Sequence, residues 1–129
     1  MMRLASLILV LSLGGCALFP STFDSQEHSR LVTISQLSAD NKICANSTLA
    51  AAASMEIVRE ADWLYRYGSS LRNNDNMISM EKNLLAISRE LQERYAQGEV
   101  SVVYCRLKLD NIHSAAGRIM AVSARRPKL

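Results

Sequence analysis

The 129-residue sequence has little glycine, little proline and few aromatic side chains. It contains 5 Gly and 2 Pro, and aromatic residues make up only 5% of it. This scarcity argues against an all-β sandwich and favours helices. Hydrophobic residues account for 49% of the chain and charged residues for 21%, which argues against intrinsic disorder. The length and composition predict one small all-α domain.

A strong excess of charge of one sign is also lacking. The 15 Lys and Arg residues are balanced by 12 Asp and Glu residues, which gives a formal net charge of +3. A domain that binds nucleic acid needs clustered cations to neutralise phosphates, and this charge is too small to imply them. We therefore expect no nucleic-acid partner.

Recognisable catalytic motifs are missing as well. The sequence has no G-x-S-x-G nucleophile motif, no glycine-rich phosphate loop and no C-x-x-C pair. His28 and His113 do not stand at metal-ligand spacing. Glu56 and Glu60 would act as a glycosidase-type carboxylate pair only inside a cleft, and the arginines around them indicate a solvated charged face. We expect a protein that is not an enzyme, with no metal site and no small-molecule substrate.

The N-terminus contains a short apolar run. Arg3 is followed by the mostly apolar segment Leu4–Leu13, whose ten residues would span roughly 15 Å as a helix, about half of a hydrocarbon core. A basic residue before so short a run indicates a secretory signal peptide over residues 1–15. Leu13-Gly14-Gly15-Cys16 then resembles the lipobox of bacterial lipoproteins. The alternative is an uncleaved anchor or an ordinary signal peptide with a chance cysteine.

The lipobox resemblance implies that Cys16 is the acylated first residue of the mature protein. Its diacylglyceryl and N-acyl chains would be the only bound cofactor-like groups, and two or three chains give near-permanent membrane attachment. By resemblance to Gram-negative lipoproteins, Ala17 in place of Asp implies delivery to the outer membrane, with the domain facing the periplasm. Residues 16–24 would be the lipidated tether.

An odd number of cysteines needs an explanation, and the sequence has 3. If Cys16 is acylated and the chain is exported, Cys44 and Cys105 remain as one pair in a compartment where disulfides persist. Closing their 61-residue separation stabilises the fold by about 4 kcal/mol on the chain-entropy model. The alternatives are two separate buried thiols or a redox pair.

Apolar residues spaced three and four apart predict four helices within a helical domain over residues 25–124, followed by a basic tail over residues 125–129. The second half of the chain has one ambiguity, because Val103 to Leu109 also alternates like a strand, but the length of the stripe favours a helix. The sequence thus predicts a four-helix bundle tied by one disulfide. The expected helices cover about 25–45, 48–67, 77–97 and 101–124. The core-facing side of the second is expected to carry Leu49, Ala53, Ile57, Ala61 and Leu64.

Several apolar residues fall partly outside the stripes that the core requires. A groove lined by them would suit an amphipathic partner helix, although a small bundle also needs wide apolar stripes. The predicted partner-binding residues are Met55, Val58, Trp63, Tyr65, Leu85, Val103 and Leu107.

This layout resembles the pilotins of type II secretion, of the PulS/OutS type. The matching features are the lipobox at Leu13–Cys16, the helix end at Ile43–Ser47 and the opening of the last helix at Tyr104–Leu107. The resemblance implies a four-helix bundle that binds the C-terminal segment of a secretin and carries it to the outer membrane. The alternative is a structural or surface envelope lipoprotein, such as a conjugation-associated or entry-exclusion component.

Overall fold

The structure is a computed structural model that describes residues 21–128.

Each of three helices begins next to a residue whose side chain caps it. An oxygen of Asp24 accepts a hydrogen bond from the Glu27 N–H at 2.9 Å and opens α1, Ser25–Asn41. Asn46 does the same for α2, Ser47–Ser70, and Ser101 for α4, Val102–Ala124. These caps satisfy backbone donors that the first helical turn leaves free.

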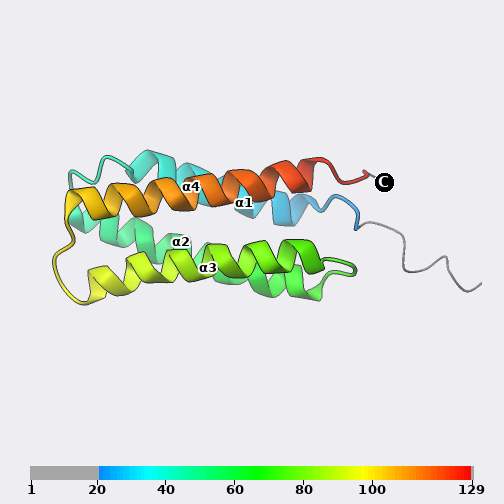
Figure 1. Cartoon of the computed structure of the whole chain (residues 1–129), viewed down its shortest axis with the longest axis horizontal. Coiled ribbons are helices and arrows are strands. Elements are labelled where there is room, and N and C mark those ends of the chain that lie inside the picture. The colour runs from blue at the N-terminus through cyan, green and yellow to red at the C-terminus, as the bar shows by residue number, and fades with distance from the viewer. Residues whose placement is uncertain (1–20, 129) are drawn as a thin grey trace, which may run out of the picture.

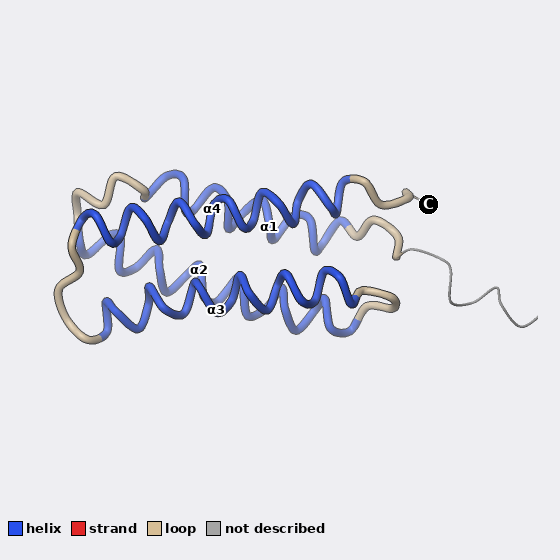
Figure 2. Tube along the Cα trace, in the orientation of Figure 1, coloured by secondary structure: helices blue, strands red, loops and turns tan. Residues whose placement is uncertain are grey.

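The remaining helix, α3, covers Asp75–Ala96, and the four helices run up and down in succession. Each packs against the next, and α4 returns to lie beside α1 (Figure 1). Residues 21–128 contain no strand, as the secondary-structure colouring of Figure 2 shows. The predicted all-α four-helix bundle is confirmed, and the segment with strand-like alternation is helical.

The bundle has two distinct ends (Figure 1). At the terminal end, the first described residues, the α2–α3 connection and the C-terminal residues 125–128 come together. At the disulfide end lie the α1–α2 and α3–α4 connections. A helix of 23 residues such as α4 is about 35 Å long, so this distance separates the two ends.

Between the ends lies an apolar core to which every helix contributes. Its largest fully buried side chains are spaced three or seven residues apart along each helix, as expected for one helix face. Such side chains each contribute roughly 1.5–3 kcal/mol relative to exposure. They are Leu31, Ile34, Ile57, Leu64, Met77, Leu84, Leu91, Leu109, Ile112 and Ile119.

Three details of the expected helices are wrong. The first helix ends at Asn41 rather than near residue 45, because Cys44 adopts a left-handed conformation with φ 55° that no helix continues. The second helix continues through Gly68 to Ser70, because Gly68 is buried in the bundle. Leu49, expected on the core face, is 62% exposed, and its neighbour Ala50 is buried instead.

The predicted signal peptide, the acylated Cys16 and most of the tether lie outside the described residues. Among the helices of residues 21–128, none has the length and apolar character needed to cross a membrane.

Candidate functional site

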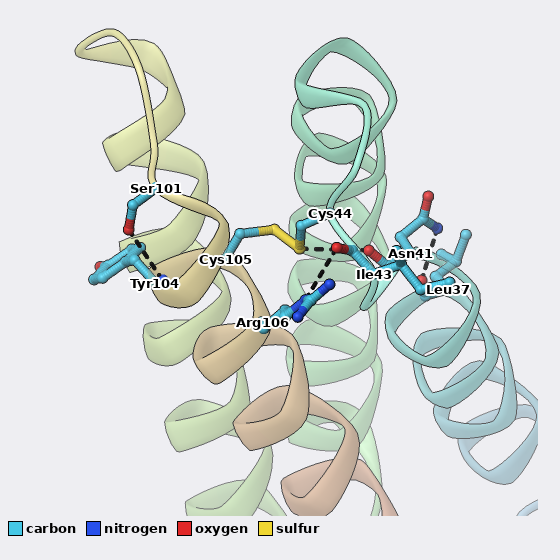
Figure 3. The surroundings of a disulfide bond; sticks show 8 residues. All are labelled: Leu37, Asn41, Ile43, Cys44, Ser101, Tyr104, Cys105 and Arg106. Atoms are coloured by element: carbon cyan, nitrogen blue, oxygen red, sulfur yellow. Dashed lines mark hydrogen bonds between the residues drawn. A yellow bond between two sulfur atoms is a disulfide. The ribbon is translucent and has the colours of Figure 1, made fainter.

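A disulfide joins the α1–α2 connection to the first turn of α4 (Figure 3). The Cα atoms of Cys44 and Cys105 are 6.2 Å apart, within the range that a disulfide spans, and both residues are buried. The predicted pairing is confirmed. Cys44 lies three residues beyond the end of α1, so the bond ties a connection, rather than a helix end, to α4.

Hydrogen bonds to backbone carbonyls also fix the α1–α2 connection. The Cys44 N–H donates to the Asn41 carbonyl at 3.1 Å, and the Arg106 Nε–H donates to the Ile43 carbonyl at 3.1 Å (Figure 3). The side-chain amide of Asn41 donates in turn to the Leu37 carbonyl at 2.8 Å. Together with the disulfide, these bonds hold the exposed Ile43 beside the start of α4.

Exposed apolar side chains gather at the disulfide end. Val103 is 77% exposed and Leu107 56% exposed, and their spacing of four residues places them on one face of α4. The other large apolar side chains exposed at this end lie in the α1–α2 connection and in the first turns of α2 and α4. We call this set the apolar end patch, after its place at the disulfide end; within it Val103 and Leu107 share one helix face, and its members are Ile43, Leu49, Val102, Val103 and Leu107.

The seven predicted partner-binding residues occupy different environments. Val103 and Leu107 belong to the apolar end patch, and Met55 is 62% exposed farther along α2. Val58 and Tyr65 are half-buried and pack against the core. The structure therefore does not bring the seven into one surface.

The two remaining predicted residues serve the fold. Leu85 is only 4% exposed, so the prediction that it lies outside the core-facing stripe is wrong. Trp63 is half-buried in the α1–α2 seam, where its ring stacks on Tyr67 with 4.7 Å between centroids. The guanidinium of Arg30 lies 4.2 Å from the Trp63 ring centroid, and Arg30 also pairs with Glu60 at 2.8 Å.

Sequence analysis missed three members of the apolar end patch. Ile43, Leu49 and Val102 lie in a connection or in a first helical turn, where helical periodicity no longer indicates which side faces the core. The usable signal was their position beside the cysteines, because a disulfide brings the two flanking segments together.

An ion pair also closes the α3–α4 seam near the apolar end patch. The ammonium group of Lys108 donates to the carboxylate of Glu90, and this hydrogen bond raises the pKa of Lys108. The same ammonium lies 5.6 Å from the ring centroid of Tyr104, and the guanidinium of Arg94 lies 5.0 Å from it. These contacts fix the first turns of α4 against α3.

The terminal end is built differently, around buried polar groups that sequence analysis did not identify. Glu27 of α1 and Glu81 of α3 are fully buried, and Asn74 of the α2–α3 connection is 1% exposed. Asn74 Nδ2 donates to Glu27 Oε2 at 2.8 Å and to the Gly68 carbonyl at 2.9 Å. Arg126, beyond the end of α4, pairs with Glu27 Oε1 at 3.4 Å. We call Glu27, Asn74, Glu81 and Arg126 the polar cluster.

Within this cluster, Glu81 carries a proton at neutral pH. Burial raises its pKa to about 10, and the hydrogen bond and negative charge of Glu27 add to the effect. Neither carboxyl oxygen of Glu81 accepts a hydrogen bond from the described residues. A proton on Glu81 removes the repulsion between the two buried carboxyl groups, and Arg126 pairs with Glu27.

Gly68 makes room for this carboxyl. A Cβ atom at position 68 would lie 2.1 Å from Glu81 Oε2, so any other residue would collide with the buried group. Close packing therefore requires glycine at position 68, and this glycine does not end α2 as the expected helix over 48–67 implied.

A hydrogen bond and a cation–π contact join the first and last described residues beside the polar cluster. The Phe23 N–H donates to the Pro127 carbonyl at 2.9 Å, and the Lys128 ammonium lies 5.1 Å from the Phe23 ring centroid. Tyr67 Oη donates to Asp24 Oδ2 at 2.9 Å, a hydrogen bond that raises the pKa of Tyr67. The segment that enters α1 is thus fixed to both α2 and the C-terminal residues.

Within residues 21–128, no three His, Cys, Asp or Glu side chains lie close enough together to hold a metal ion. Comparison of the chain with protein-family models, with curated proteins and with solved structures produced no match.

Proposed function

We propose that this chain is an exported lipoprotein, anchored through acylated Cys16, whose bundle binds an apolar segment of a protein partner at the apolar end patch. The observation that carries the proposal is the separation of roles between the two ends. The segment leading toward Cys16 enters at the terminal end, and the exposed apolar side chains gather at the opposite end. An apolar patch left exposed on a small domain is typical of an interaction site.

The partner class follows from the pilotin-like layout. A pilotin-like function assigns the patch to the C-terminal segment of a secretin subunit, which would bind as an amphipathic helix with its apolar face on Val103 and Leu107. The lipid on Cys16 would then carry the bound subunit to the outer membrane. No catalytic step is required of the bundle, whose role is to bind and to position.

A binding titration tests the patch directly. The oxidised mature chain is titrated into a fluorescently labelled peptide that covers the C-terminal segment of the secretin from the same bacterium. Burying the exposed parts of Val103 and Leu107 contributes about 2 kcal/mol to binding, so the variant V103D/L107D should bind about thirtyfold more weakly. Both side chains are exposed, and position 103 lies in the first turn of α4, where a negative charge is favourable, so this variant keeps its fold.

A matched control uses a different helix. Asn76 and Asn83 are exposed residues of α3 away from the patch, and N76D/N83D adds the same two negative charges. This control should bind like the wild type. Absence of any binding by the wild-type chain, or equal loss in both variants, would refute the proposed use of the patch. For the anchor, continued palmitate labelling of Cys16→Ser would refute acylation at that residue.

A further inference from the structure

The exposed charge of the terminal end is basic. Arg72 of the α2–α3 connection and Arg125 and Lys128 of the C-terminal segment are all exposed. Among the described residues, none of the three has a carboxylate within ion-pairing distance. Three cations therefore face outward at the end where the chain leads toward Cys16.

The carboxyl groups of this end face inward instead. Asp24 caps α1 and accepts a hydrogen bond from Tyr67, and Glu27 is buried against Arg126. Glu81 is buried and protonated. Of the terminal-end carboxylates within residues 21–128, only Asp75 is exposed. The polar cluster thus removes negative charge from the surface and leaves the cations unopposed there.

The chain between Cys16 and the bundle is short. Five residue steps separate Cys16 from Ser21, and a fully extended chain covers at most about 18 Å over that length. The hydrogen bond from the Phe23 N–H to the Pro127 carbonyl fixes the segment before α1 to the C-terminal segment. It limits the length of free chain before α1 and places the C-terminal cations beside the start of that helix. If Cys16 is acylated, as the proposed function requires, the basic residues cannot move far from the lipid headgroups.

We propose that the terminal end is a docking surface for anionic phospholipid headgroups, with Arg72, Arg125 and Lys128 as the contacting cations. Each cation close to an anionic membrane surface raises the occupancy of the docked state about fivefold, and salt weakens the attraction. Docking orients the bundle so that its long axis points out from the membrane surface and the apolar end patch faces the periplasm. The half-buried ring of Phe23, which lies against Lys128, belongs to the same surface.

Hydrogen exchange measures this docking in the acylated protein. The full mature protein is placed in nanodiscs of zwitterionic phosphatidylcholine, with or without 30% phosphatidylglycerol. We expect the amides of residues 71–73 and 124–128 to exchange several-fold more slowly in the anionic discs, and this difference to disappear at 0.5 M salt. Comparison of the two lipids for each variant removes any change in intrinsic fraying.

Two charge variants separate the surface from net charge. R125E/K128E should lower the ratio of docked to undocked protein by at least about 25-fold, fivefold for each lost cation, and abolish the lipid difference. K42E/R59E changes the net charge equally, at exposed cations outside the terminal end, and should keep the difference. Equal exchange in the two lipids, by protein whose intact mass shows acylation, would overturn the docking surface alone. A mass that shows unacylated Cys16 would overturn the proposed anchor and this inference together.

Discussion

Replacing Glu81 with glutamine tests the protonated state of the polar cluster. Glu81 is fully buried, and its pKa is raised to about 10 from an ordinary value of 4.5. Between these two values the folded protein holds a proton that the unfolded chain has released. The free energy of unfolding of the wild type therefore falls as the pH rises, by up to about 1.4 kcal/mol per pH unit. Glutamine has nearly the same shape and stays neutral, so E81Q does not carry this penalty.

The magnitude follows from the pH interval. The two proteins should have similar stability near pH 5, where little free energy is needed to keep the proton on Glu81. Over the three units from pH 5 to pH 8, E81Q should gain up to about 4 kcal/mol relative to the wild type. The direction is unusual, because most substitutions of a buried polar residue destabilise a protein at every pH.

Urea denaturation followed by far-ultraviolet circular dichroism at pH 5, 6.5 and 8 provides the measurement. Glu93→Gln is the matched control, because Glu93 is exposed on the same helix and loses the same charge. Its stability should parallel that of the wild type at all three pH values. A constant difference between E81Q and the wild type from pH 5 to pH 8 would show that Glu81 is ionised in the folded protein, and would refute its protonated state.

Two further substitutions test the surroundings of the same carboxyl. Arg126→Met leaves the buried carboxylate of Glu27 without its counter-ion, so it should lower the free energy of unfolding at pH 7 by about 3–5 kcal/mol in urea denaturation. The control Arg125→Met, at an exposed arginine, should change the free energy of unfolding by less than about 0.5 kcal/mol. Equal effects of the two substitutions would contradict the buried pairing. Gly68→Ala places a methyl group 2.1 Å from the Glu81 carboxyl and should lower the melting temperature. Gly117→Ala is the control, because a Cβ there has no described atom within 4 Å; it should raise the melting temperature, since alanine has a higher helix propensity than glycine. A Gly68→Ala variant that is more stable than the wild type would show that the space beside Glu81 can hold a methyl group.

The helices and the disulfide could be predicted from the sequence because their signals are local or exclusive. Stripes such as Leu31–Ile34 and Leu109–Ile112 follow from helical geometry alone. The pairing of Cys44 with Cys105 followed from the two cysteines left when the third is assigned to the predicted lipobox. Boundaries were less certain where one residue's conformation decides them, as the left-handed Cys44 does at the end of α1.

The polar cluster could not be predicted because its members come from three distant parts of the sequence, at residue 27, at residues 74 and 81, and at residue 126. Glu27 and Glu81 are separated by 53 intervening residues, and each on its own has the composition of a solvated helical position. Nothing local distinguishes them from Glu90 or Glu93, which are exposed. Only the packing of the helices, with Gly68 leaving space between them, creates the buried site.

The two ends of the bundle are closed by different physical means, and this difference bears on where a partner can bind. At the terminal end, buried charge and hydrogen bonds join α1, the α2–α3 connection and the C-terminal segment, and they require close packing to exclude water. At the disulfide end, a covalent bond holds the connections together, so fewer apolar side chains must be buried there to keep the helices in place. Leu49, Val103 and Leu107 can then remain exposed without loss of the fold. Under the proposed function, the disulfide end is therefore where an apolar segment binds, and the terminal end is the side that leads to the lipid anchor.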